Sequence, residues 1–466
     1  PITPQHADSS SEFSRELEKL PIRELSPRFI DVNNDAQLVR LNEYLSLYSV
    51  KNPVNDIFTL NFNFQIGQTA CPTLKQLVSY LPFIGTETYS FEELRTRLQT
   101  LGSTLMFDVD DKEFVVKESG FDRNFDETMR TVSHFFHSPK ADENRVKMLI
   151  DDAKVTEKAF FKSSNEVASA LFEYVKYGKE SFYLRKYSLK EIKKMKGKDL
   201  VDLFRKIQKI SCDLHYCGSL PTERVSERIK HYFNVDDVSI PSSNPYKRTT
   251  QVYDKQKVFF YHMPDVSQSI VYCYMQGRPV ESEKDRHASK LFSNYFGIDR
   301  TSILFQEIRE YRSFAYFTYG GCQLPPLKNI QDPISFVCIL STQNDKTNDA
   351  IAVLDSLIRE MPERPDKINS VRQSILNQIN NNYPNLRDIS TKIASYLNDG
   401  YLSDPNKDLF AAVQQMSMED IMSFYRQYLY GETPVYIVVG NKHRMDMKKL
   451  AEFGEVIHVN KKSFYR

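Results

Sequence analysis

The sequence of 466 residues lacks an excess of charge of either sign, because 62 Lys and Arg residues stand against 61 Asp and Glu residues. No global field favours a polyanion, so we predict no nucleic-acid partner. Long apolar runs are also missing. The longest, around residues 435–439, falls far short of the roughly 20 residues that cross a bilayer, and we expect no transmembrane segment.

The six cysteines lack the spacing of a disulfide or metal framework. Cys212 and Cys217 lie five positions apart, and no second pair accompanies them. We therefore predict reduced cysteines, most of them in the core. Free thiols favour a reducing interior, whereas an export signal could have preceded Pro1, so both the cytoplasm and the periplasm of a bacterial-type cell stay open.

Catalytic motifs are missing as well. The sequence contains no P-loop, no nucleophile elbow and no H-E-x-x-H. His134 and His137 are three positions apart on a predicted helix, but no carboxylate accompanies them, and we interpret them as surface histidines. No metal site is predicted in this chain.

The order of polar and apolar segments predicts three parts. Residues 1–28 are polar and interrupted by prolines, and we expect a linker or docking arm. Residues 29–240 and 241–466 are predicted as two domains, divided by a stretch rich in Pro, Ser and Asn at residues 239–253. Because the chain begins at Pro1 and not at Met, we expect it to be a piece of a longer protein.

Both predicted domains mix strands with helices. In the first, residues 58–64 alternate as a half-buried strand does, a helix over residues 74–84 ends at Gly85, and Ser90 caps a helix over residues 91–101. Residues 189–210 are predicted as one helix. Other predicted helices cover residues 125–136, 144–158, 164–177, 284–296, 348–359, 367–380, 388–398 and 418–429.

The two domains show the same order of elements near their ends. A helix over residues 198–207 precedes the strand CDLHYCG, and a helix over residues 418–428 precedes the strand VYIVVG. This indicates an internal repeat of roughly 220 residues. We predict an α+β fold: two related domains in tandem, each a mostly antiparallel sheet with helices packed on one face.

The segment LFQEIREYRSFAYF, residues 304–317, carries a spacing that suggests chemistry beyond packing. Its apolar residues first recur at helical spacing and then alternate, so we predict a helix that runs into a strand. Arg309 falls on the helix and Tyr316 just beyond it. A guanidinium and a phenol at such a junction can hold the carbonyls or carboxylate of an extended peptide. An exposed helix arginine and a half-buried strand tyrosine are the alternative.

This segment resembles the signature of the insulinase/pitrilysin family of zinc metallopeptidases, whose members are built from tandem α+β domains. The resemblance implies that Arg309 and Tyr316, which keep the family's separation of seven positions, contact peptide substrate. The family often has Gly before that tyrosine, whereas this chain has Ala315.

An active domain of that family carries H-x-x-E-H on a helix before a Gly-Thr turn, and its two histidines bind Zn²⁺. The helix before Gly85 reads KQLVSYLPFI and places Gln76, Ser79 and Tyr80 at the His, Glu and His positions. None of the three replaces the original chemistry. The downstream carboxylate of the family falls near Asp151 and Asp152, which we interpret as an exposed acidic pair.

The resemblance therefore points to the non-catalytic half of such a peptidase, whose catalytic N-terminal half or subunit holds the zinc. This half would close the chamber and bind the peptide backbone, without a cofactor of its own. A second hypothesis is an inactive scaffold subunit of the same fold that acts in protein assembly. A third is an unrelated α+β interaction module with the same Arg-Tyr spacing.

Overall fold

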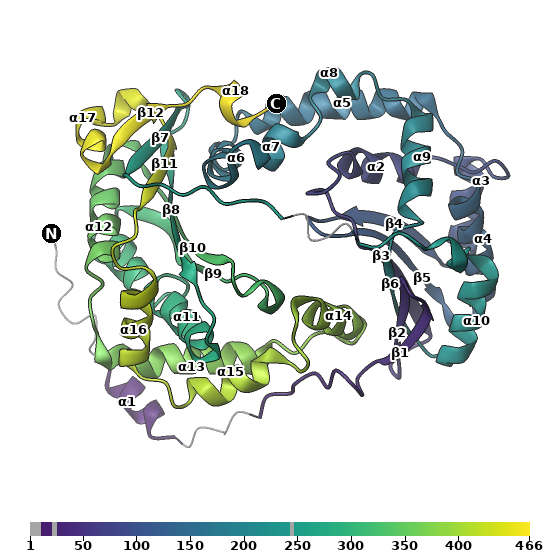
Figure 1. The fold of residues 1–466 in the computed structure, drawn as a ribbon, viewed down its shortest axis with the longest axis horizontal. Helices are drawn as coiled ribbons and strands as arrows, with labels where there is room; N and C mark the ends of the chain where they lie inside the picture. The colour runs from purple at the N-terminus through teal and green to yellow at the C-terminus, as the bar shows by residue number, and fades with distance from the viewer. Residues whose placement is uncertain (1–10, 21–25, 243–246) are drawn as a thin grey trace.

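Two six-stranded sheets, one in each half of the chain, form the frame of the protein (Figure 1). The computed structural model describes residues 11–20, 26–242 and 247–466. The first sheet has the order β1-β2-β6-β3-β5-β4 and the second the order β12-β7-β11-β8-β10-β9. The first contains β1 (Gln37–Asn42), β2 (Leu45–Lys51), β3 (Ile57–Phe64), β4 (Thr104–Val109), β5 (Phe114–Phe121) and β6 (Cys212–Gly218). The second contains β7 (Lys257–His262), β8 (Gln268–Pro279), β9 (Ala315–Gln323), β10 (Pro333–Gln343), β11 (Val435–Gly440) and β12 (Glu455–His458).

Five of the six strands follow the same order in the two sheets, which confirms the predicted repeat and the α+β class. The sixth differs, because β1 pairs antiparallel with β2 whereas β12 pairs in parallel with β7. In each sheet the last long strand of its half, β6 or β11, inserts at the third position. It pairs in parallel with one neighbour and antiparallel with the other. Most of the remaining pairs are antiparallel, as the sequence predicts.

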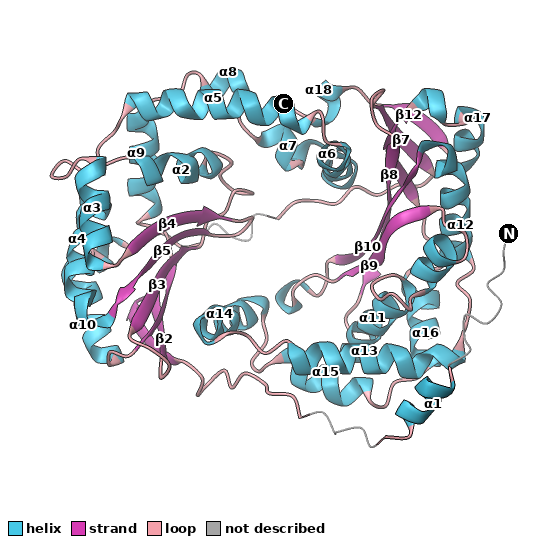
Figure 2. Ribbon diagram, turned by 180° about the vertical axis from the view of Figure 1, so that it is seen from behind, coloured by secondary structure: helices cyan, strands magenta, loops and turns pink. Residues whose placement is uncertain are grey.

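The outer face of each sheet is covered by helices of its own half (Figure 2). Along β3, Phe58, Leu60 and Phe62 point into this helical layer, at the period of two that the sequence shows. The first half contributes α2 (Leu74–Tyr80), α3 (Phe91–Leu101), α4 (Phe125–His137), α9 (Gly197–Ile207) and α10 (Thr222–Tyr232). The second contributes α11 (Glu283–Phe296), α12 (Thr347–Arg359), α13 (Ile368–Asn381), α15 (Pro405–Val413) and α16 (Met418–Tyr428).

The inner face of the second sheet is covered by a helix from the first half, α6 (Ser164–Tyr177), which follows α5 (Glu143–Phe160). Val167 and Leu171 of α6 are fully buried against Ile437. The neighbouring Val438 belongs to the outer core, because successive side chains of a strand point to opposite faces. The predicted layer of helices on one face is therefore accompanied by one helix on the other.

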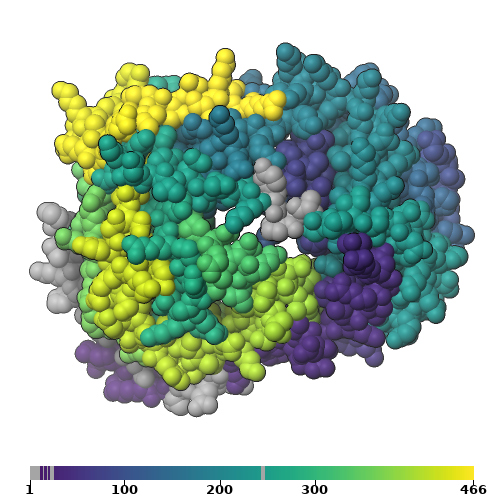
Figure 3. Space-filling view, in the orientation of Figure 1, coloured from purple at the N-terminus to yellow at the C-terminus, as the bar shows by residue number. Residues whose placement is uncertain are grey.

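The inner face of the first sheet receives the reciprocal helix, α14 (Ile389–Asp399) from the second half. Ile389 and Ile393 pack on Tyr48 and Val50 of β2. The two halves thus exchange one helix each across the centre of the molecule. An opening remains between them (Figure 3).

The ends of the chain also join the two halves. The backbone N–H of Ile30 donates to the Asp404 carboxylate at 2.9 Å, and the ring of Phe29 lies 6.1 Å from that of Phe410. The short helix α18 (Lys461–Phe464) buries Phe464 beneath α6. Helix α1 (Glu12–Glu18) lies in the predicted linker. Residues 1–10 and 21–25 of this linker are outside the described residues.

Local signals placed several helix ends correctly. The Ser90 hydroxyl accepts from the Glu93 N–H at 3.2 Å, the Glu93 carboxylate accepts from the Ser90 N–H at 2.8 Å, and α3 ends at Gly102 with φ of 65°.

All six cysteines are free, as predicted. Within the described residues no helix has the length and apolarity to span a bilayer. The boundary between residues 240 and 241 stays a prediction, since residues 243–246 lie outside the description.

One helix prediction was wrong, and one helix was not predicted. Residues 189–210 form α8 (Leu189–Ile192) and α9, because α9 begins afresh at Gly197, whose N–H donates to Glu143 at 2.9 Å. A Cβ atom at Gly197 would lie 2.6 Å from the Tyr80 hydroxyl, so this start has no room for a side chain. Helix α15 was not predicted, although Asp404 as cap and proline in the first turn are a start signal.

A buried carboxyl group lies within the first half. Glu118 on β5 is 1% exposed beside Leu60, and neither of its oxygens has a hydrogen-bond partner among the described residues. Burial raises the pKa of Glu118 to about 8 from its ordinary value of 4.5. The folded protein therefore keeps a proton at Glu118 that the unfolded chain releases between these two values.

The exchanged helix α6 is expected to contribute strongly to stability. Leu171→Ala should lower the free energy of unfolding by about 2–5 kcal/mol, because it empties a fully buried site between α6 and the second sheet. Urea denaturation measures the change. Leu402→Ala, at a side chain 87% exposed, is the control and should change stability by less than about 0.5 kcal/mol. Equal effects of the two substitutions would contradict the packing described.

Glu118 is expected to make stability depend on pH. Above pH 4.5 the unfolded chain binds fewer protons at this residue than the folded one, so the free energy of unfolding falls as pH rises towards 8. Glu118→Gln removes this pH dependence. The free energy of unfolding of the variant should therefore increase relative to that of wild type by up to about 1.4 kcal/mol per pH unit between pH 4.5 and 8. Urea denaturation at pH 5, 6, 7 and 8 tests this. A constant difference, like that expected for the exposed control Glu92→Gln, would refute it.

Candidate functional site

The segment around Arg309 and Tyr316 lies at the edge of the second sheet. The predicted helix is present but short: residues Phe305–Glu310 are wound as a π-helix, labelled η5, and lead into the edge strand β9. Strand β9 pairs with β10 along its length, whereas on its other side an isolated bridge joins Gly320 to Gly297. The first part of β9, which holds Tyr316, is therefore an open sheet edge.

Arg309 and Tyr316 lie side by side. The guanidinium carbon of Arg309 is 5.5 Å from the ring centroid of Tyr316 and 4.8 Å from that of Phe305, within the range of cation–π contacts. The Tyr316 residue is 76% exposed, and the Arg309 side chain is 42% exposed with Glu310 at 3.6 Å. Among the described residues neither side chain has a hydrogen-bond partner, so the donors of both are available.

The backbone around Tyr316 has an unusual conformation. Ser313 has φ of 52°, the only positive value of a non-glycine residue in the described chain. Phe317 pairs with Ser341 and Ala315 pairs with Thr342, so Tyr316 is the extra residue of a β-bulge. A bulge re-aims a side chain, and here Ala315 enters the core while Tyr316 points to solvent.

Two groups of contacts hold this segment in place. The Glu307 carboxylate of η5 pairs with Arg312 and Arg364, each at 2.5 Å, which ties η5 to the chain beyond α12. At the far end of β9, the Lys176 ammonium of α6 donates to the Gln323 side chain at 2.7 Å. Burial lowers the pKa of Lys176 to about 8. The exchanged helix thus contacts the strand that carries Tyr316.

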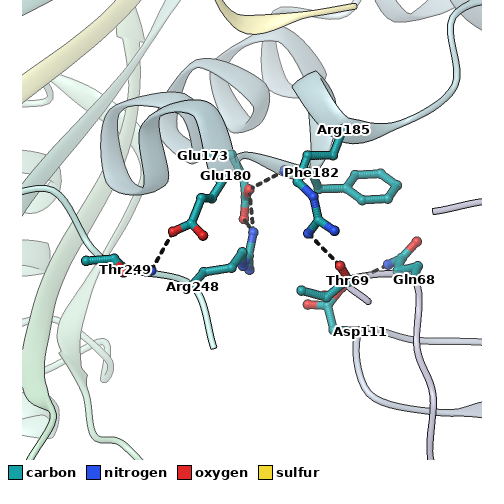
Figure 4. A network of polar contacts seen from close by, with 9 residues as sticks. All are labelled: Gln68, Thr69, Asp111, Glu173, Glu180, Phe182, Arg185, Arg248 and Thr249. Atoms are coloured by element: carbon teal, nitrogen blue, oxygen red, sulfur yellow. Dashed lines mark hydrogen bonds and ion pairs between the residues drawn. The ribbon is translucent and has the colours of Figure 1, made fainter. Parts of the chain in front are cut away.

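A polar network fixes α6 at the junction of the two halves (Figure 4). Glu173 of α6 accepts from Arg248 at 2.8 and 3.0 Å and from the Phe182 N–H at 3.1 Å. Arg185 of α7 (Phe182–Arg185) donates to the carbonyl of Thr69, beyond β3, at 2.6 Å. Sequence reasoning missed these residues, because no local pattern links a glutamate to an arginine 75 positions away.

Of the three positions on α2 predicted to correspond to the zinc motif, Tyr80 has a structural role in the first half. The Tyr80 hydroxyl accepts from the Asp142 N–H at 2.7 Å and lies 3.3 Å from the Asp142 carbonyl, so it joins α2 to the start of α5. Burial raises the pKa of Tyr80. Ser79 is exposed and bonds the Lys75 carbonyl, and the Gln76 side chain is half-buried.

These residues do not fit zinc. An amide, an aliphatic hydroxyl and a phenol already bonded to backbone offer no imidazole, thiolate or carboxylate ligand. Within residues 11–20, 26–242 and 247–466, no group of three or more His, Cys, Asp or Glu residues has metal-binding geometry. Asp151 and Asp152 are exposed on α5, where Asp151 pairs with Lys154 at 2.8 Å.

Tyr80 is expected to matter for stability. Tyr80→Phe should lower the free energy of unfolding by about 1–3 kcal/mol, because it leaves buried polar groups of the Asp142 backbone without a partner. Thermal or urea denaturation measures this change. Ser79→Ala on the same helix should be neutral within about 0.5 kcal/mol. A Tyr80→Phe protein as stable as wild type would show that the hydroxyl has no such role.

Comparisons with known proteins relate part of the sequence and the fold of the chain to peptidases. Residues 207–368, which include Arg309 and Tyr316, match the family model described as the peptidase M16 inactive domain. No curated protein sequence matches the chain significantly.

Solved structures share the fold at low sequence identity. A peptidase M16 inactive domain from Pseudomonas fluorescens superposes with a TM-score of 0.68 at 13% identity, over 88% of this chain and 99% of that one. The periplasmic protease PqqL from Escherichia coli gives 0.65 at 14% identity, over 92% of this chain and 50% of its own. The ferredoxin protease FusC, solved with Arabidopsis ferredoxin, gives 0.63 at 13% identity, over 91% and 48%. The chain thus has the fold of a solved peptidase M16 inactive domain, and its residues 207–368 match the model of that domain, which confirms its resemblance to the non-catalytic half of insulinase- and pitrilysin-type peptidases.

Proposed function

We propose that this chain is the non-catalytic half of a zinc peptidase and supplies a peptide-binding surface to a catalytic partner half. The pairing of Arg309 with Tyr316 is the observation that supports this most directly. Two side chains with free hydrogen-bonding groups lie together at an open sheet edge, and partly exposed ion pairs of Glu307 hold the segment behind them. Such preorganised donors bind a flexible peptide at a lower entropic cost.

The roles of the two residues follow from their chemistry. The Arg309 guanidinium presents several donors in one plane, suited to a peptide carbonyl or a terminal carboxylate. The Tyr316 phenol can donate to a carbonyl or accept from an N–H. Phe317 and Tyr319, which are also exposed on β9, add apolar surface for substrate side chains.

A catalytic partner half is part of the proposal. It would carry the H-x-x-E-H helix and hold zinc, which activates a water molecule for attack on the peptide bond when bound. In this chain Arg309 and Tyr316 would hold the substrate backbone so that its scissile bond meets that site. The chain spans about half of the protease PqqL and of the ferredoxin protease FusC, and this supports a partner of similar size.

Peptide binding by this chain alone tests the surface without the catalytic half. Arg309→Ala and Tyr316→Phe should each raise the Kd of a fluorescent peptide of ten to twenty residues, by about tenfold for the arginine and about threefold for the tyrosine. Fluorescence anisotropy measures both. The matched controls are Arg95→Ala and Tyr430→Phe, at exposed side chains elsewhere, and they should leave Kd unchanged.

Activity with the catalytic half tests the role in catalysis. When the two halves are mixed, Arg309→Ala and Tyr316→Phe should lower kcat/KM, because a misplaced backbone reacts slowly. Values within about twofold of wild type for both variants would rule out the proposed contacts. Unchanged kcat/KM together with intact assembly of the halves would favour the scaffold function.

A further inference from the structure

A cavity of about 280 Å³ lies in the first half, away from Arg309 and Tyr316. It is bounded by the outer face of the first sheet and by the C-terminal ends of α4, α9 and α10. Its volume is near the lower end of the range for small-molecule sites. No residue of the proposed peptide surface lines it.

The inner wall of the cavity is apolar and largely aromatic. Phe62, Phe136 and Phe233 line it as one cluster of rings in mutual contact, with centroids 4.9–5.0 Å apart. Val238 also lines it, while Leu214 and Ile229 are fully buried. A water molecule needs two or more polar partners, and this wall of apolar side chains provides none. An empty apolar cavity weakens a core in proportion to its volume, so an apolar occupant would stabilise the fold.

The mouth of the cavity is mainly basic. His137, Arg205 and Lys209 line it together with one carboxylate, Asp237. The Lys209 ammonium has no partner among the described residues, and its backbone carbonyl is fixed by the N–H groups of residues 239 and 240 at 3.0 and 2.9 Å. Arg205 pairs with Asp202 at 3.1 Å in an exposed ion pair, which a ligand can replace at small cost.

Basic side chains near helix C-termini also offset the helix dipoles. The dipoles explain why cations gather here, but they leave the apolar hollow beneath them unexplained.

We propose that this cavity is a binding site for a medium-chain carboxylate, whose apolar tail lies against the aromatic wall and whose carboxylate pairs with Lys209 and Arg205. The site is independent of the peptide surface and of any catalytic partner.

Calorimetric titration of the whole chain with hexanoate, octanoate and decanoate, each below its micelle concentration, tests the proposal. Affinity should rise about fourfold for each methylene that enters the cavity. Octanol and octylammonium have the same tail with a neutral or cationic head, and they should bind more weakly than octanoate. Equal binding of the three octyl compounds would overturn the anionic class of ligand, and no binding of any carboxylate would overturn the site.

Two kinds of variant locate the binding. Lys209→Gln should raise the Kd of octanoate about two- to fivefold, whereas Lys206→Gln, three residues earlier at the end of α9 but outside the cavity, should not change it. Val238→Phe fills the cavity and should abolish binding while the melting temperature stays the same or rises. Val238→Leu, which adds one methylene at the same position, is a milder filling variant if Val238→Phe does not fold. Octanoate binding that survives a folded filling variant would overturn the proposal.

Discussion

The exchange of α6 and α14 between the halves is the constraint on which the rest of the structure depends. Each sheet has an apolar inner face that its own half leaves partly uncovered, and a helix from the other half closes it. Burial of Leu171 against one sheet and of Ile393 against the other joins the folding of the two halves. Two domains with an ordinary polar interface would be free to move, whereas these share their cores.

The candidate site depends on this exchange. Strand β9 lies at the edge of the second sheet, and Lys176 of α6 reaches its end at Gln323. The network around Glu173 and Arg248 fixes α6 where the halves meet. Arg309 and Tyr316 therefore stand on a segment held from two sides, although both side chains are exposed. This is the arrangement expected of a surface that orients a flexible ligand.

In the first half, helix α2 carries the positions that the sequence predicts to correspond to a zinc motif. Gln76, Ser79 and Tyr80 are predicted to stand where an active relative would carry the His, Glu and His of that motif. In the structure Tyr80 anchors the start of α5. None of the three side chains offers an imidazole, thiolate or carboxylate to zinc.

Much of the fold could be predicted from local pattern, and the rest could not for identifiable reasons. The alternation of β3, the Ser90 cap and the helical period of α6 are local, and each appears in the structure. The spacing of Arg309 and Tyr316 is local too, and the structure brings them together. The sheet that α6 covers, the bulge at Tyr316 and the cavity beneath Lys209 depend on contacts between distant residues, which one sequence does not reveal.

Peptidase activity on a quenched peptide of ten to twenty residues tests the central claim most directly. The chain is assayed with zinc, first alone and then mixed with a half that carries the H-x-x-E-H helix. We expect no cleavage by the chain alone and chelator-sensitive cleavage by the mixture, above that of the catalytic half alone. Chelator-sensitive cleavage by this chain alone, or no gain on mixing, would contradict the account.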